Sequence, residues 1–134
     1  MADRTVFSSI LPANEYSAAR FPRGTVATRE EVVGVRRLDD VLDELAPTVS
    51  GQRVFPKLDT QGYDLNVYRG LGARVDDVVA LLSEVSLIPI YEGMPHWTES
   101  IAEYEASGFG VIGLNPVTHD HGRVLEYDCL LQRS

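Results

Sequence analysis

The alternation of helical and strand periodicity along the chain is the feature that most constrains its fold. Four apolar residues between Leu38 and Leu45 recur at the spacing of one helix face, which predicts a helix over 38–46 that Pro47 ends. The further predicted elements are a strand at 53–59, a helix at 64–71, a turn at 76–77, a strand at 80–86, a helix at 98–107 and strands at 109–114 and 123–132. Strands that alternate with helices predict an α/β sheet.

The C-terminal end of the sequence has a clear secondary-structure pattern, whereas the N-terminal end does not. The loop at 115–122 is short, so the last two strands are expected to form an antiparallel hairpin that adds an antiparallel edge strand. Residues 1–34 are poorly patterned because serines and prolines break up their apolar pieces. We expect this segment to be a surface extension, or a segment that once packed against something absent from the chain. The patterned domain is therefore predicted to cover residues 35–134.

Charge and composition exclude several classes of protein. Twelve basic and twenty acidic residues give a net charge of −8, and the arginines are scattered, whereas nucleic-acid binding proteins show a clustered basic face. No apolar run approaches the roughly 20 residues that span a bilayer, and no signal segment opens the chain, so we expect a cytoplasmic protein. The one cysteine, Cys129, excludes an internal disulfide and is expected to be an inert core thiol.

A group of short motifs in order along the chain carries a resemblance to a known family. The central one is Lys-Leu-Asp-Thr-Gln-Gly-Tyr-Asp-Leu at 57–65, followed by Val-Tyr-Arg-Gly at 67–70. The others are Ser-Ser-Ile-Leu at 8–11, Val35 with Leu-Asp-Asp-Val-Leu at 38–42, Glu-Val-Ser-Leu at 84–87, Tyr-Glu-Gly at 91–93, Gly-Phe at 108–109 and Tyr-Asp-Cys-Leu-Leu at 127–131. Together they resemble the FkbM-like methyltransferases, which depend on S-adenosylmethionine.

The resemblance implies a fold and an activity. The chain resembles the C-terminal half of a Rossmann-like methyltransferase domain, strands four to seven of a seven-stranded sheet. The implied function is O-methylation, with S-adenosyl-L-methionine as cofactor, of a hydroxyl group on a small molecule such as a sugar, a glycolipid or a secondary metabolite. The Gly-rich strand-to-helix turn that holds the cofactor in such domains is absent from the sequence, so the cofactor-binding residues stay unassigned. We therefore expect a truncated domain that is slow or inactive on its own.

A non-catalytic alternative stays open. A half-sheet exposes an unpaired edge, which favours pairing with another chain. The chain would then be an interaction module or a remnant that completes its sheet by forming a homodimer.

The candidate catalytic residues are Asp59, Lys57 and Gln61, which follow or end the strand predicted at 53–59. Ligands of open α/β sheets bind outside the carboxyl ends of the strands. Asp59 could accept a proton from a substrate hydroxyl or help to hold a metal ion. Lys57 lies on the same face of the strand, and a salt bridge between the two would make them a structural pair with a lowered Asp59 pKa. Gln61 is either a turn residue or faces the substrate.

Glu84 and His96 are the candidate substrate-binding residues. A carboxylate in the middle of a buried strand needs a partner, so Glu84 either lines a pocket or has a structural partner. His96, next to Trp97, lies in a loop before a predicted helix whose N-cap is Thr98. The tripeptide His119-Asp120-His121 is interpreted as hairpin-turn chemistry, because its spacing is not a familiar metal-ligand spacing, and no metal site is predicted.

Pro56 lies inside the strand predicted at 53–59 and cannot donate to a ladder. Either the strand is an edge strand with the Pro56 nitrogen pointing outward, because its usual neighbour is missing, or the proline distorts the strand.

Overall fold

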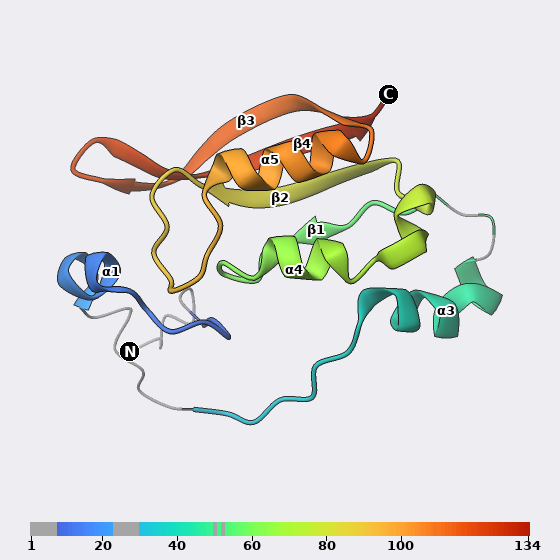
Figure 1. The fold of residues 1–134 in the computed structure, drawn as a ribbon, viewed down its shortest axis with the longest axis horizontal. Helices are drawn as coiled ribbons and strands as arrows, with labels where there is room; N and C mark the ends of the chain where they lie inside the picture. The colour runs from blue at the N-terminus through green and yellow to red at the C-terminus, as the bar shows by residue number, and fades with distance from the viewer. Residues whose placement is uncertain (1–7, 23–29, 50, 52) are drawn as a thin grey trace.

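The computed structural model describes residues 8–22, 30–49, 51 and 53–134, and its centre is a four-stranded mixed sheet (Figure 1). The strands are β1 (Lys57–Leu58), β2 (Ala80–Ser86), β3 (Phe109–Asp120) and β4 (Arg123–Arg133), in the order β1-β2-β4-β3. β1 is parallel to β2, whereas β4 is antiparallel to both of its neighbours. The predicted α/β class and the terminal antiparallel hairpin are therefore confirmed.

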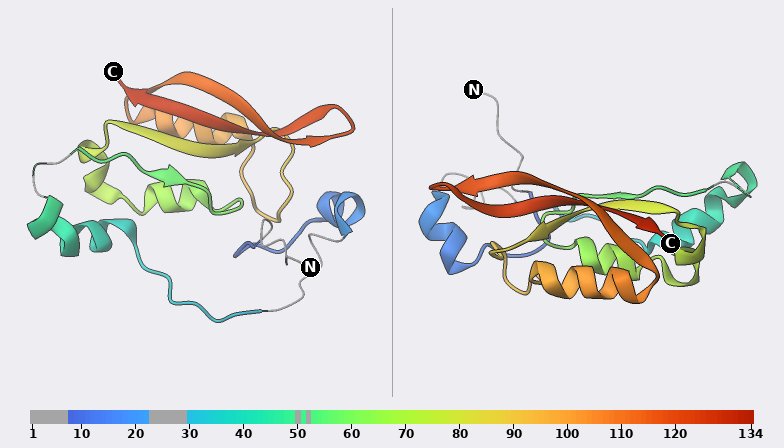
Figure 2. Two further views of the ribbon diagram at one scale, coloured as in Figure 1. Left: turned by 180° about the vertical axis from the view of Figure 1, so that it is seen from behind. Right: turned by 90° about the horizontal axis from the view of Figure 1, so that it is seen from above.

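The helices are α1 (Glu15–Arg20), α3 (Leu38–Val49), α4 (Asp64–Arg69), the 3-10 helix η2 (Gly72–Asp77) and α5 (Trp97–Ala106). α4 and α5 lie side by side on one face of the sheet, and among the described residues no helix is seen against the other face (Figure 2, right). The core fills the layer between these helices and the sheet. Tyr104 of α5 is fully buried there, 2.8 Å from the Ser83 hydroxyl of β2.

The hairpin differs from its prediction in length and in placement. β3 continues to Asp120, so the predicted loop at 115–122 shrinks to a turn at His121 and Gly122, with φ angles of 45° and 82°. Such left-handed residues match the twist of two-residue hairpins. The sequence predicted that the hairpin adds an antiparallel strand at the edge of the sheet. The strand that runs antiparallel to both of its neighbours is β4, and it lies inside the sheet, between β2 and the edge strand β3.

β1 is the opposite edge of the sheet, and Pro56 interrupts it. Val54 forms an isolated bridge with Val78, and regular pairing resumes only at Lys57. The Pro56 carbonyl accepts a hydrogen bond of 3.0 Å from the Leu82 N–H on the β2 side. Because proline has no N–H to donate to a carbonyl of β2, the predicted strand at 53–59 is reduced to two paired residues. β1 is therefore an edge strand, but the Pro56 carbonyl and nitrogen both face β2, so the expected outward-pointing nitrogen is wrong and the proline distorts the strand.

Several helix boundaries were predicted wrongly. α3 continues through Pro47 to Val49, because proline removes one helical hydrogen bond but its φ is compatible with the helix. α5 begins at Trp97 with His96 as N-cap, so Thr98 is not the cap. β2 has the predicted bounds, and Gly108 has φ 87°, as expected after the end of a helix.

The described part of the N-terminal segment, 8–22, is more ordered than predicted. It contains α1, whose N-cap Asn14 accepts a hydrogen bond from the Ser17 N–H. Ala13 forms a bridge with Tyr91, and the Pro12 carbonyl accepts from the Glu92 N–H at 2.9 Å. The segment thus packs on the loop at 87–96.

No helix in the described part of the chain is long and apolar enough to cross a lipid bilayer.

Candidate active site

The turn that follows β1 shapes the predicted site at the carboxyl ends of β1 and β2. Gln61 has φ 52° and Gly62 has φ 92°, both in the left-handed region. This region costs a non-glycine residue roughly 1–3 kcal/mol and persists where the surroundings hold it in place. A Cβ atom at Gly62 would lie 3.0 Å from Cδ2 of Tyr91, so the turn packs closely on the loop at 87–96.

Gln61 is held by hydrogen bonds to side chains from separate segments of the chain. Its main-chain carbonyl accepts one of 2.6 Å from the Ser9 hydroxyl, and its Oε1 accepts one of 3.0 Å from the Tyr91 hydroxyl. Its Nε2 donates to Oε2 of Glu84 over 3.2 Å and lies 3.5 Å from Oδ1 of Asp59. The amide is therefore oriented with its nitrogen toward the two carboxylates.

Glu84 is half-buried in the middle of β2, and Gln61 is the partner that this position requires. Burial raises the pKa of Glu84 to about 8, with the negative charges of Glu126 and Asp59 as further causes. The carboxyl group is therefore mostly protonated at neutral pH and ionises just above it. A carboxyl with such a pKa can exchange a proton with a bound hydroxyl.

Lys57 and Asp59 form the salt bridge that the sequence predicted as one alternative. Nζ of Lys57 lies 2.8 Å from Oδ2 of Asp59, and both side chains are largely exposed. The hydrogen bond from Lys57 lowers the pKa of Asp59. Asp59 is thus a weak base, and the geometry favours the structural role for this pair.

A small hollow beside Glu84 is partly open to solvent, and its cavity volume of about 10 Å³ is enough for about one water molecule. It is lined by Gly62, Asp64, Leu65, Glu84, Ser86, Met94, Pro95 and Ser100. The Ser86 hydroxyl donates to Oε1 of Glu126 over 3.1 Å, and burial raises the pKa of both Glu126 and Asp64. The site is therefore a cluster of carboxyl groups, several of them buried.

His96 is not among the residues that line this pocket. Its Nδ1 lies 2.7 Å from Oγ1 of Thr98, and its ring meets Trp97 edge-on at 6.2 Å. Its backbone forms a bridge with Ser86, so it lies close to the site but serves the start of α5.

The tripeptide at 119–121 lies far along the hairpin and has another role. Asp120 is 8% exposed, accepts a hydrogen bond of 2.9 Å from the Tyr16 hydroxyl and pairs with Arg20 at 3.0 Å. It anchors α1 to the hairpin tip. No group of three or more His, Cys, Asp or Glu side chains in the described ranges could hold a metal ion.

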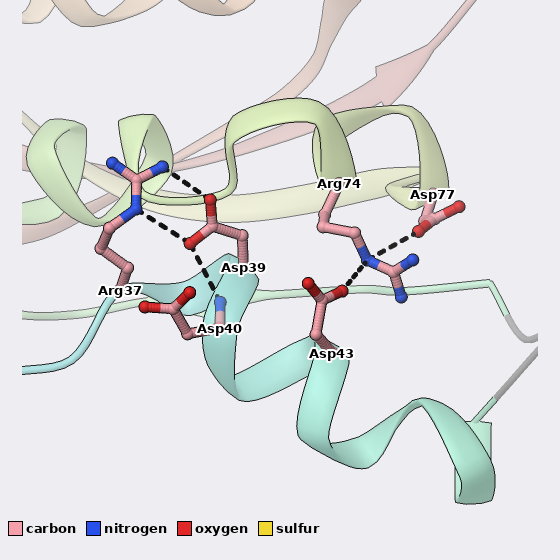
Figure 3. Close-up of polar contacts among 6 residues, drawn as sticks. All are labelled: Arg37, Asp39, Asp40, Asp43, Arg74 and Asp77. Atoms are coloured by element: carbon pink, nitrogen blue, oxygen red, sulfur yellow. Dashed lines mark hydrogen bonds and ion pairs between the residues drawn. The ribbon is translucent and has the colours of Figure 1, made fainter.

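Gly72, which follows α4, allows η2 to pack closely against the start of α3. A Cβ atom at Gly72, which has φ 52°, would lie 2.7 Å from Oδ2 of Asp39 and 3.3 Å from Nη2 of Arg37. Figure 3 shows the ion pairs around the start of α3 and beside η2, which are Arg37–Asp39, Arg74–Asp43 and Arg74–Asp77. The close backbone approach that glycine permits is thus used to dock α3.

Among the described residues there is no complete binding site for S-adenosylmethionine. Sites for molecules of this size enclose about 300–1,000 Å³, more than the pocket beside Glu84 offers. The glycine turn at Gly72 is filled by α3. The cofactor-binding residues remain unassigned.

Sequence reasoning missed Tyr91, Asp64, Ser86 and Glu126. Tyr91, Asp64 and Ser86 belong to the motifs that carry the family resemblance, which was the available signal. Glu126 is placed by its register opposite Ser86, which no local pattern reveals.

Comparisons of this chain with protein-family models, with curated proteins and with solved structures give no match.

Proposed function

We propose that the chain is the C-terminal half of an S-adenosylmethionine-dependent O-methyltransferase domain and holds the proton acceptor for the hydroxyl group that is methylated. The observation that carries this proposal is Glu84, a carboxyl with a pKa of about 8 that the strained Gln61 orients beside a pocket. The motif at 57–65 and the parallel strands followed by an antiparallel hairpin support it, because the resemblance implies both features.

The chemistry needs a group that removes a proton. In O-methylation the substrate hydroxyl loses its proton to a base and its oxygen takes the methyl group, while the methyl–sulfur bond breaks and S-adenosylhomocysteine would leave. A base works best when its pKa is near the working pH. Glu84 meets this condition, and Asp59 does not, because Lys57 lowers its pKa. The cofactor would supply the methyl group, and no complete binding site for it is seen among the described residues.

The proposal is tested by calorimetric titration of the folded chain with S-adenosylhomocysteine and by methyl transfer from labelled S-adenosylmethionine to a panel of sugars, glycolipids and phenols. We expect weak binding and slow transfer whose rate rises as the pH approaches about 8, since Glu84 must be ionised. Glu84→Gln should abolish transfer, whereas Glu92→Gln, at an exposed position, should not. A folded chain that neither binds the product at millimolar concentration nor transfers a methyl group contradicts the proposal.

A second candidate is the non-catalytic module that completes its sheet by dimerisation. Both β1 and β3 are edge strands of the described sheet, and edges pair readily. Gel filtration with light scattering distinguishes the two, because a monomer at all concentrations contradicts the dimer.

A further inference from the structure

An N-terminal arm, residues 8–22, lies on the loop at 87–96 (Figure 1). Ala13 of the arm forms a bridge with Tyr91 of the loop. The Asn14 side chain donates a hydrogen bond of 2.8 Å to a main-chain carbonyl of the same loop. The arm therefore holds the segment that carries the Tyr91 hydroxyl.

The arm packs on a small hydrophobic cluster that is separate from the main core. The buried members of this cluster come from the loop at 87–96 and from β4, and side chains of the arm pack against them. The buried members are Ile90, Tyr91, Met94 and Leu125, and the arm contributes Leu11, Tyr16 and Phe21. Because local clusters open at a lower free energy than the whole fold, the arm can detach while the main core stays folded.

Ser9 joins the arm to the turn that follows β1. Its hydroxyl donates a hydrogen bond of 2.6 Å to the main-chain carbonyl of Gln61 and accepts one of 3.0 Å from the Leu11 N–H. A serine hydroxyl has one proton, so the bond to Gln61 uses its whole donating capacity. Gln61 has φ 52°, which is unfavourable for a residue with a side chain and persists only where the surroundings hold it.

The side chain of Gln61 depends on the arm as well. Its Oε1 accepts from the Tyr91 hydroxyl over 3.0 Å, and its Nε2 donates to Oε2 of Glu84 over 3.2 Å. The arm thus supplies the main-chain contact of Gln61 directly, and it holds the side-chain contact through the bridge between Ala13 and Tyr91.

We propose that Ser9 is a positioning residue of the candidate site, which keeps Gln61 in its left-handed conformation and so keeps the Gln61 amide on Glu84. The arm then assembles the site when it docks and releases Gln61 when it detaches. The consequence for methyl transfer rests on the proposed function, whereas the positioning of Gln61 does not. If Ser9 only stabilised the arm by accepting from Leu11, its removal would leave the Gln61 side chain in place.

The test is NMR spectroscopy of the ¹⁵N-labelled full chain without cofactor, following the side-chain amide of Gln61 from pH 6 to pH 9. In this range Glu84 changes charge beside Nε2, with a pKa of about 8, whereas Lys57 lowers the pKa of Asp59. The wild-type signal should therefore titrate, and Glu84→Gln should abolish the titration.

Four variants separate positioning from general docking. Ser9→Ala should move the Gln61 signal to that of a solvent-exposed glutamine and abolish its pH dependence, and Ser9→Thr, which keeps the hydroxyl, should restore both. Ser8→Ala is the matched control at an exposed position and should change neither. Tyr16→Phe removes the bond to Asp120 at the far end of the arm and should also leave Gln61 in place.

Three results overturn the proposal. The first is a Gln61 signal in Ser9→Ala that matches wild type. The second is an equal change in Ser8→Ala or Tyr16→Phe. The third is the absence of nuclear Overhauser contacts between Ser9 and Gln61 in the wild type, a measurement that keeps the test valid if Ser9→Ala unfolds.

The transfer assay separates this inference from the proposed function. If the chain transfers methyl groups, Ser9→Ala should slow transfer about fivefold to tenfold, the fold-change that one hydrogen bond is worth. A chain whose Gln61 signal responds to Ser9 but which transfers no methyl group confirms the positioning role and contradicts the proposed function.

Discussion

Glu84 makes the stability of this protein depend on pH in a way that one substitution can reveal. Its pKa is about 8 in the folded chain and near 4.5 when the chain is unfolded. Below pH 4.5 both states hold the proton, and Glu84 contributes no pH dependence. Between pH 4.5 and 8 the unfolded state ionises while the folded state does not, so the free energy of unfolding falls as pH rises.

The magnitude follows from this interval. At about 1.4 kcal/mol per pH unit, ionisation in the unfolded state costs the fold about 3 kcal/mol at pH 7. Because Glu84 is only half-buried, solvent reduces this penalty, and we expect about 1–3 kcal/mol. Glu84→Gln removes the proton equilibrium but keeps an oxygen that accepts from Gln61. It should therefore stabilise the protein by that amount at pH 7 and by much less at pH 5.

Urea unfolding followed by circular dichroism at pH 5, 6, 7 and 8 measures the effect. Glu92→Gln is the control, since it makes the same Glu-to-Gln change at an exposed site on the neighbouring loop. The reasoning is refuted if wild type and Glu84→Gln lose stability in parallel from pH 5 to pH 8.

Three further substitutions test the packing, two by urea unfolding and one by hydrogen exchange. Gly72→Ala should destabilise by about 1–3 kcal/mol, because the residue has φ 52° and its Cβ would lie 2.7 Å from a carboxylate oxygen at the start of α3; an unchanged midpoint contradicts this. Asp120→Asn should weaken the hold on Tyr16, so hydrogen exchange should quicken at 15–20 and not in β2; uniform exchange would oppose it. Tyr104→Phe should cost about 1–3 kcal/mol by leaving the buried Ser83 hydroxyl unpaired, and a neutral result would show that the hydrogen bond is dispensable.

Local patterns in the sequence determined the order of helices and strands. The bounds of β2 and the glycine after α5 follow from side-chain alternation and from residues that tolerate positive φ, which act over a few positions. The hairpin itself was predicted, but its loop at 115–122 is a two-residue turn. The same local rules placed Lys57 and Asp59 on one face of a strand, and the salt bridge between them followed. They also indicated that Glu84 needed a partner.

Only the tertiary structure decided which partner that was. Gln61, Tyr91 and Ser9 meet because segments far apart in the chain pack together, and nothing in their local sequence specifies the meeting. The insertion of β4 between β2 and β3 is likewise a choice among pairings that the sequence alone leaves equal. That choice sets the register that brings Glu84 opposite Asp128 and Ser86 opposite Glu126. The burial of Glu84 and the carboxylates around it arise from this register, which is why the raised pKa of Glu84 is a property of the fold.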